Sequence, residues 1–318
     1  MATPKFSDDV ELAREYMGVP PPANAHLPTA AELLNLCGTD CPRGGVALPP
    51  EAPVFWVKHG HSVYWNEVAA GTVAYHELRR MNSPVRAPAV YYAFQYRFSK
   101  FIVMEYISGK TVGKCLEEAE SDDEKERLRG QVVLCLSELH RIPIAPGSRP
   151  AAVDGDKIRH AAFDCQKAPR HYENADQLEE HMNRFLKRLK IPVQSEGLSR
   201  EPMVFCHSDW YIDNFMIDDA GGAVVIDFAD ASILPVSFAR HMPWDHRLGF
   251  DVHNKVWFPD SERPVENSQA VSSVAGMMPI GLAFFSKLSK DVSGGDEETQ
   301  KRLADSTSFY FGVGKEEE

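Results

Sequence analysis

The stretch 203–228 constrains the fold of this chain more than any other, and it reads MVFCHSDWYIDNFMIDDAGGAVVIDF. Its short apolar runs are separated by a polar loop and by the turn Asp-Asp-Ala-Gly-Gly at 218–222. Gly and Asp readily adopt the left-handed backbone angles that a tight connection between strands requires. We therefore expect 215–218 and 223–228 to form a β-hairpin, preceded by a loop that the hairpin holds rigid.

Three polar side chains in this stretch have the character of catalytic groups. Asp209 and Asn214 lie in the loop, and Asp227 follows an Ile-rich run, where a carboxylate is costly unless it has a charged partner or a metal. Phosphoryl transfer needs a carboxylate that orients the attacking hydroxyl and accepts its proton, and oxygen ligands for the Mg²⁺ that bridges the nucleotide phosphates. The three side chains supply one base and two such ligands. The alternative interpretation makes Asp209 and Asn214 turn and cap residues and Asp227 a satisfied structural carboxylate.

The segments HSDWYIDN and IDF, with 13 residues from Asn214 to Asp227, resemble two motifs of a known family. These motifs are the His-x-Asp-x-x-x-x-Asn and Asp-aromatic pair of the aminoglycoside phosphotransferase and choline kinase-like family, a branch of the protein-kinase-like fold. The resemblance implies an α+β fold of two lobes, a small antiparallel β-sheet lobe and a larger, mainly helical lobe. We place the N-terminal lobe at 1–107, with a helical lead-in, and the C-terminal lobe at 108–318.

The resemblance also implies a role for each matching residue. Asp209 is expected to be the catalytic base, and Asn214 and Asp227 the Mg²⁺ ligands, with ATP as the phosphoryl donor. His207 belongs to the same motif, and we interpret it as a structural residue that hydrogen-bonds the backbone near Asp227 rather than as a proton carrier.

The family holds the α- and β-phosphates with a Lys on a strand and a Glu on the next helix. Its pattern is Val-Val-Lys, a Gly, then Glu-Ala at the head of a helix, which Lys58, Gly60 and Glu67 match, with Val68 in place of Ala. Glu77, further along the same helix, is the rival partner for Lys58. The alternatives are a surface lysine at a sheet edge and a first-turn Glu favoured by the helix dipole.

The apolar run 101–107 resembles the last strand of the small lobe, which leads into the hinge of such kinases. By that resemblance the backbone groups of Met104, Glu105 and Tyr106 would contact the adenine edge.

Some positions depart from the family pattern. No convincing glycine-rich phosphate loop is present; Gly44-Gly45 is the nearest candidate, and an ordinary turn explains it equally well. Ser208 stands where a Gly is frequent, and a side chain there restricts the backbone. Trp210 replaces a more usual Leu. After Asp227, Ala229 stands where a Glu is common and Ser232 where a Gly is common.

Periodicity and capping residues predict the remaining elements. Residues 145–175 form a long loop that could contact substrate. Strands are expected at 46–48, 54–58, 89–94 and 101–107, and helices at 5–18, 29–36, 65–81, 111–120, 122–142, 176–190 and 269–289.

Composition limits the partners of the protein. The 318 residues carry a net charge of −12 without a basic stripe, which argues against nucleic acid as the main partner. The run 270–285 is shorter than the ~20 apolar residues of a membrane-spanning helix. The N-terminus lacks the apolar core of a signal peptide, so we expect a cytoplasmic protein with reduced thiols. Cys37 and Cys41 have no second pair at ligand spacing, which disfavours a zinc site.

The sequence therefore predicts an ATP- and Mg²⁺-dependent phosphotransferase that acts on the hydroxyl of an unidentified small molecule. The alternative is a kinase-like scaffold that is inactive or repurposed for a different reaction and binds a nucleotide or a small ligand. A protein-serine kinase is less favoured, because no Ala-Pro-Glu element follows Asp227. No pattern indicates an oligomeric state.

Overall fold

The structure is a computed structural model. It describes residues 6–7, 9–163, 166–241, 248–252, 255–260, 267–275, 298 and 301.

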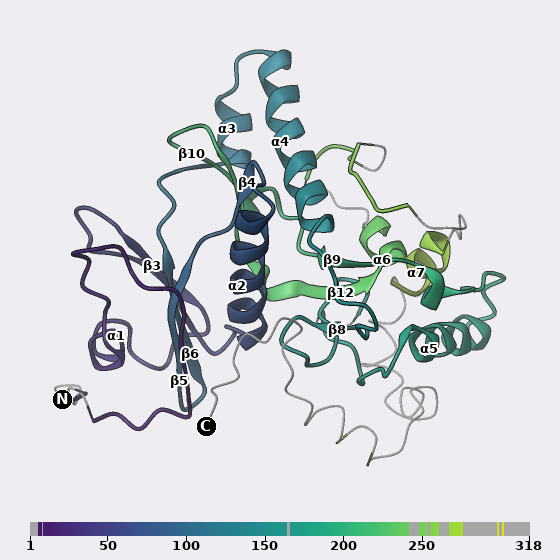
Figure 1. Ribbon diagram of the computed structural model, residues 1–318, viewed down its shortest axis with the longest axis horizontal. Coiled ribbons are helices and arrows are strands. Elements are labelled where there is room, and N and C mark those ends of the chain that lie inside the picture. The colour runs from purple at the N-terminus through teal and green to yellow at the C-terminus, as the bar shows by residue number, and fades with distance from the viewer. Residues whose placement is uncertain are drawn as a thin grey trace.

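A five-stranded antiparallel sheet forms one side of the molecule (Figure 1), with the strand order β1-β5-β6-β3-β2. Helix α1 contributes to the apolar cluster on one face of this sheet, and α2 contributes to the cluster with Val90, Ala93 and Ile102. The strands and these two helices are β1 (Arg14–Met17), α1 (Ala30–Cys37), β2 (Gly44–Leu48), β3 (Phe55–Gly60), α2 (Trp65–Arg80), β5 (Val90–Tyr96) and β6 (Ser99–Glu105).

The rest of the described chain contains two smaller sheets, five α-helices and three short 3-10 helices. The four-stranded sheet has the order β4-β11-β10-β7, and the three-stranded sheet has the order β8-β12-β9. Their strands are β4 (Val85–Arg86), β7 (Gly109–Thr111), β8 (Ala151–Ala152), β9 (Met203–His207), β10 (Phe215–Asp218), β11 (Ala223–Val225) and β12 (Ala231–Pro235). The helices are α3 (Val112–Glu118), α4 (Asp122–His140), α5 (Ala175–Arg188), α6 (Val236–Arg240) and α7 (Ser268–Ala275).

This mixture of antiparallel sheets and helices confirms the predicted α+β class. The division at residue 107 stays a prediction. Strand β4 comes from the N-terminal side of that limit, yet it pairs in parallel with β11 of the C-terminal side. Within the residues that the structure describes, no helix is long and apolar enough to span a membrane.

The helix predicted at 5–18 is wrong. Residues Arg14–Met17 instead form β1, which pairs antiparallel with β5 along the edge of the large sheet. A short isolated helix is marginal in water, whereas the exposed edge of β5 offers a ladder of backbone hydrogen bonds. Tertiary pairing therefore outweighs the amphipathic pattern of this segment.

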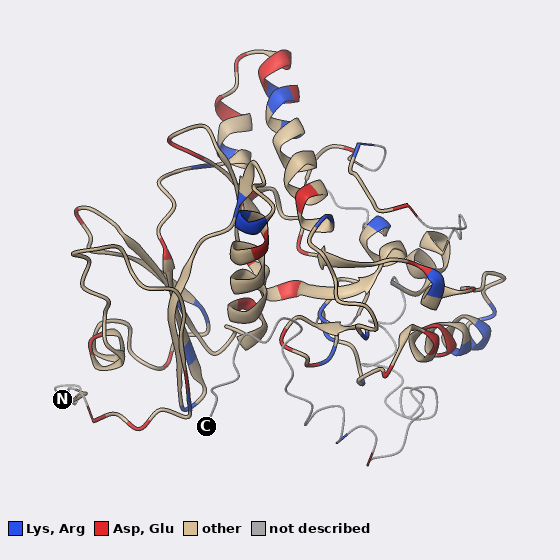
Figure 2. Ribbon diagram, in the orientation of Figure 1, with Lys and Arg blue, Asp and Glu red and all other residues tan. Residues whose placement is uncertain are grey.

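The helices predicted at 29–36, 65–81, 111–120, 122–142 and 176–190 are confirmed to within a few residues, and side-chain caps support all of them except α2. Thr29 caps α1: its hydroxyl accepts from the Glu32 N–H, and the Glu32 carboxylate accepts from the Thr29 N–H. Figure 2 shows acidic residues at the start of α4, where they complement the positive end of the helix dipole. The predicted helix 269–289 begins within α7, and its part beyond residue 275 lies outside the described residues.

The hairpin predicted in the central stretch is present as β10 and β11, with Phe215 opposite Val225 and Ile217 opposite Ala223. Strand β7 pairs with the outer side of β10. The Thr111 hydroxyl donates to Asp213 Oδ1 over 2.5 Å, in the loop before the hairpin. Strand β7 therefore holds both the hairpin and the loop in place.

Gly109 and Gly130 provide a matched test of this support. Gly109 has φ +150°, and a Cβ there would lie 2.2 Å from the Ile217 carbonyl oxygen of β10. We expect Gly109→Ala to lower the free energy of unfolding by about 2 kcal/mol or more. Gly130, in α4, has open space around its Cα, so Gly130→Ala should raise it by about 0.5–1 kcal/mol. Urea unfolding measures both, and equal effects would contradict the close approach of β7 to β10.

Candidate active site

Lys58 lies at the centre of a charged cluster formed by three separate segments of the chain. Its Nζ contacts Glu67 Oε1 at 2.5 Å and Asp227 Oδ1 at 2.9 Å. Lys58 comes from β3, Glu67 from the first turn of α2, and Asp227 follows β11. The side chains of Lys58 and Glu67 are 9% and 5% exposed, and that of Asp227 is 16% exposed. The structure thus pairs Lys58 with Glu67, whereas Glu77 pairs with Arg80 instead.

A second cation, Arg43, reaches the same carboxylate. Its Nη2 lies 2.5 Å from Asp227 Oδ2, so each oxygen of Asp227 contacts one cationic side chain. Arg43 directly precedes β2, and its side chain is 55% exposed. The site is therefore open to solvent on the side of Arg43.

These contacts decide the protonation of the cluster. Burial acts to raise the pKa of Asp227, but Lys58 and Arg43 outweigh burial and lower it, so Asp227 is a carboxylate at neutral pH. Burial likewise acts to lower the pKa of Lys58, but Glu67 and Asp227 raise it. Burial raises the pKa of Glu67 to about 7.

Asp209 and Asn214 are brought together in the loop before the hairpin. The Asn214 amide nitrogen donates to the Asp209 carbonyl at 2.9 Å and to Asp209 Oδ2 at 3.0 Å. The Ile226 N–H donates to the Asn214 carbonyl at 2.9 Å, which ties this loop to the residue before Asp227. Asp209 is close enough to the charged cluster to contribute, with Asp227, to raising the pKa of Arg43, against the opposing effect of burial.

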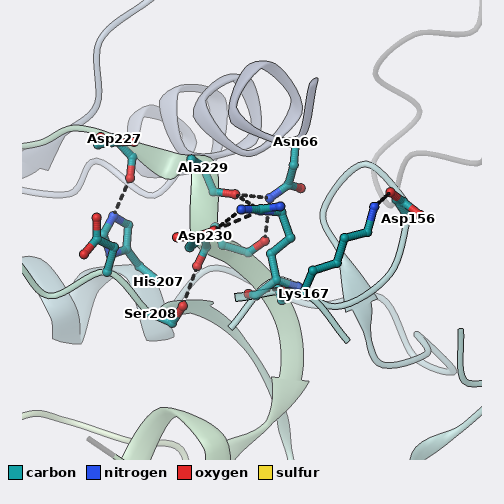
Figure 3. Close-up of polar contacts among 12 residues, drawn as sticks. Asn66, Asp156, Lys167, His207, Ser208, Asp227, Ala229 and Asp230 are labelled. Carbon is teal, nitrogen blue, oxygen red and sulfur yellow. Dashed lines mark hydrogen bonds and ion pairs between the residues drawn. The ribbon is translucent and has the colours of Figure 1, made fainter. Parts of the chain in front are cut away.

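The backbone of Asp227 is in the left-handed region, with φ 58° and ψ 71°. This conformation is uncommon for residues other than Gly, although Asn and Asp tolerate it better than most, and hydrogen bonds from neighbouring segments hold it here. His207 supplies one restraint, because its Nε2 donates to the Asp227 carbonyl at 3.0 Å (Figure 3). The structural role predicted for His207 is therefore confirmed.

Further restraints hold the turn that follows Asp227 (Figure 3). The Asn66 amide donates to the carbonyls of Ala229 and Ala231 at 2.9 and 2.8 Å. Arg159, from the predicted loop 145–175, donates to the Ala229 carbonyl at 2.9 Å and pairs with Asp230 Oδ1 at 2.7 Å. The segment that carries Asp227 is thus fixed by hydrogen bonds from α2 and from that loop.

The positions that depart from the family pattern have structural uses. The Ser208 hydroxyl donates to the Asp230 carbonyl at 2.8 Å, and its backbone is not left-handed. The Ser232 hydroxyl donates to the Arg159 carbonyl at 2.8 Å and accepts from the Arg159 N–H at 2.9 Å. Trp210 is buried in the core, and its indole N–H donates to the His207 carbonyl. The Ser208 hydroxyl and the Trp210 indole therefore attach the loop around Asp209 to neighbouring backbone carbonyls.

Met104, Glu105 and Tyr106 lie at the end of β6 and just beyond it. The Glu105 N–H donates to the Ala89 carbonyl at 2.8 Å, and the Tyr106 N–H donates to the Val54 carbonyl at 3.0 Å. A base bound here would have to use other atoms of these two residues. The nucleotide contact assigned to all three stays a prediction.

Gly44 and Gly45 are not in a loop. They begin β2 and pair with His59 and Lys58 of β3. A Cβ on Gly45 would lie 2.3 Å from the indole of Trp56, so this glycine makes room for a cross-strand aromatic side chain. The pair therefore gives no phosphate-binding turn.

The donor set fits Mg²⁺ better than a softer metal. Asp227 is an ionised carboxylate, and the amide oxygen of Asn214 is the side-chain atom left to act as a ligand, because the amide nitrogen donates to Asp209. Within the described parts of the chain, no group of three or more His, Cys, Asp or Glu side chains could hold a metal by itself. Mg²⁺ typically takes only one or two carboxylates and completes its shell with water and phosphate oxygens.

The sequence did not reveal Arg43, Asn66 or Arg159 as parts of this site. Arg43 lies in the segment CPRGG, which has the composition of an ordinary turn. Asn66 is adjacent to Glu67, and Arg159 lies in a segment without a periodic pattern. Only the tertiary arrangement brings these three residues to Asp227 and the turn that follows it.

The model of the Phosphotransferase enzyme family, APH, matches residues 64–238, which is more than half of the 318 residues. No curated protein matches the sequence.

The solved structures that are similar to this chain include aminoglycoside phosphotransferases. The apo form of a thermostable mutant of APH(4)-Ia is 10% identical, with a TM-score of 0.44 over 89% of this chain and 99% of that chain. The streptomycin-ATP-APH(2")-IIa ternary complex is 14% identical, with a TM-score of 0.40 over 89% and 97%. ADP-bound APH(2'')-Ib is 15% identical, with a TM-score of 0.39 over 96% of both chains.

These identities and TM-scores are low, so membership of the family follows from the match to the family model. The segment 64–238 contains Glu67, the Asp209–Asn214 loop and Asp227. The chain belongs to the phosphotransferase enzyme family and is a small-molecule kinase of the aminoglycoside phosphotransferase type.

Proposed function

We propose that this protein transfers the γ-phosphoryl group of ATP, with Mg²⁺, to a hydroxyl of a small-molecule alcohol. The observation that carries the proposal is the contact of Lys58 with both Glu67 and Asp227, beside a loop that contains Asp209 and Asn214. A cation held by two carboxylates next to a potential base is the arrangement that phosphoryl transfer requires.

Each side chain has a distinct task in this proposal. Lys58, oriented by Glu67, contacts the α- and β-phosphates of ATP. Asp227 and Asn214 hold Mg²⁺, which when bound neutralises charge on the phosphate oxygens. Asp209 orients the acceptor hydroxyl and takes its proton.

The reaction balances without a further reactant. The acceptor oxygen forms a bond to the γ-phosphorus, and the bond from that phosphorus to the bridging oxygen of the β-phosphate breaks. ADP leaves with the electron pair of the broken bond, and the proton of the acceptor hydroxyl moves to the Asp209 carboxylate. The Asn214 amide donates to Asp209 Oδ2, and this hydrogen bond restricts rotation of the Asp209 carboxylate.

The acceptor is a small molecule in this proposal, and the acidic chain is compatible with an aminated alcohol. The predicted loop 145–175 lies beside α2, because the Asp154 N–H donates to Asn66 Oδ1 at 3.2 Å. The same loop contacts the turn after Asp227 through the ion pair of Arg159 with Asp230. We propose that this loop contributes to acceptor binding. The proposed location is the cytoplasm.

Replacing the phosphate-binding lysine tests the nucleotide assignment. Lys58→Met keeps most of the side-chain volume and removes the charge, so we expect the affinity for Mg·ATP to fall about tenfold or more, as for loss of a charge-assisted hydrogen bond. Isothermal titration calorimetry measures the change, and Lys187→Met, on the exposed end of α5, serves as the control. A parent protein that binds no Mg·ATP would favour the alternative of a repurposed kinase-like scaffold.

Replacing the proposed base tests the chemistry separately from binding. Asp209→Asn should lower kcat by about 10²–10⁴, because general-base assistance is lost, and leave the affinity for Mg·ATP nearly unchanged. ADP release is measured with a panel of small-molecule alcohols. Asp219→Asn, in the exposed hairpin turn, is the matched control. An Asp209→Asn variant that turns over at the parental rate would show that Asp209 is not the base.

A further inference from the structure

Arg43 is a cation at the active site that belongs to neither of the two sequence motifs. It lies 184 residues before Asp227 in the chain, yet its Nη2 is 2.5 Å from Asp227 Oδ2. Its guanidinium is charged at neutral pH, as arginine side chains in proteins are, and it directly contacts the Asp227 carboxylate. The site therefore contains a charged group whose function the reaction scheme above does not explain.

The backbone of the segment 39–43 is firmly attached to the turn after β3. The carbonyls of Cys41 and Pro42 accept from the N–H groups of His61 and Ser62 at 3.1 and 2.9 Å. The Thr39 carbonyl accepts from the Ser99 hydroxyl at 2.6 Å. Because the backbone of this segment is fixed and the Arg43 side chain is half-exposed, Arg43 can move by rotation of its side chain alone.

Both carboxylate oxygens of Asp227 have a cationic partner. Oδ1 contacts Lys58, and Oδ2 contacts Arg43. Lys58 is buried and also bonded to Glu67, whereas Arg43 is 55% exposed and has Asp227 as its one ion-pair partner among the described residues. A divalent cation that binds Asp227 would therefore displace Arg43 rather than Lys58.

A displaced Arg43 would need another anion, and nucleotide phosphate is the anion that the proposed function brings to the site. A guanidinium binds phosphate oxygens through two parallel hydrogen bonds. Gly44 and Gly45, next to Arg43, lie in β2 and form no phosphate-binding turn. The Arg43 side chain would thus bind the nucleotide phosphates, a task that a glycine-rich loop performs in other kinases.

We propose that Arg43 is an exchangeable cation, which binds Asp227 Oδ2 in the free protein and a nucleotide phosphate when a divalent cation takes that oxygen. This inference depends on the proposed function, because it assumes that nucleotide and metal share the site of Asp227. It adds a phosphate-binding residue to that site and a competition between Arg43 and the metal for one carboxylate oxygen.

Two binding measurements on Arg43→Gln test the exchange without measuring activity. In the first, Mn²⁺ alone is titrated, and we expect the variant to bind it about tenfold more tightly, because no guanidinium has to be displaced. In the second, the non-hydrolysable analogue AMP-PNP is titrated in saturating Mn²⁺, so that the metal already occupies Asp227 and Arg43 is free to bind phosphate. We expect the variant to bind AMP-PNP about tenfold more weakly than the parent, because the phosphate loses its guanidinium partner. Arg188→Gln, an exposed change at the end of α5, should alter neither affinity.

The opposite direction of the two effects is the signature of exchange. If Arg43→Gln strengthens binding of both Mn²⁺ and AMP-PNP, Arg43 is a permanent plug of the site and the exchange is wrong. If neither affinity changes while the parent binds Mg·AMP-PNP, Arg43 has no role at the site, and the proposed function still holds. A parent that binds neither metal nor nucleotide would overturn both proposals. Circular dichroism of each variant verifies that the fold is retained.

Discussion

The contact of Lys58 with Glu67 and Asp227 is the interaction on which the rest of the structure depends. Lys58 belongs to the large sheet, Glu67 to α2, and Asp227 to the chain after β11, so one ammonium group joins three elements. A buried lysine is costly without partners, and two carboxylates supply them. The same contact prepares the site chemically, because it keeps Asp227 ionised and places a cation beside the Asp209 loop.

The backbone of Asp227 and of the turn after it is held by hydrogen bonds from side chains of other segments. Its left-handed conformation is held by His207, and the turn after it is held by Asn66 and Arg159. These donors come from three different segments and converge on the carbonyl groups of Asp227, Ala229 and Ala231; Figure 3 shows His207 at Asp227 and Asn66 at Ala229. The backbone around Asp227, a proposed Mg²⁺ ligand, is thus held by His207 from within the first motif and by Asn66 and Arg159 from outside it. Ser208 adds one more such contact through its hydroxyl.

Local signals in the sequence predicted much of this arrangement. The Gly-Gly turn predicts the hairpin next to Asn214 and Asp227. The pair of Lys58 and Glu67 is predicted by the resemblance to the family pattern, with Glu77 as the rival partner. The family model then assigns the chain by the segment 64–238. Three features could not be predicted in this way. Residues 14–17 are a strand only because β5 offers a free edge, and Arg43 reaches Asp227 only through the packing of its segment on the turn after β3. The restraint of the Asp227 turn by Arg159 likewise exists only in the folded chain.

The most direct test of this account is a double-mutant cycle between Lys58 and Asp227, measured as the free energy of unfolding. The variants are Lys58→Met, Asp227→Asn and the combination of the two, and the unfolding of each is followed in urea. The account predicts a coupling free energy of about 1.5–3 kcal/mol, as expected for a charged pair at 2.9 Å that is largely removed from solvent. Two substitutions whose effects add to within about 0.5 kcal/mol would contradict it, because Lys58 would then not join the large sheet to the chain after β11.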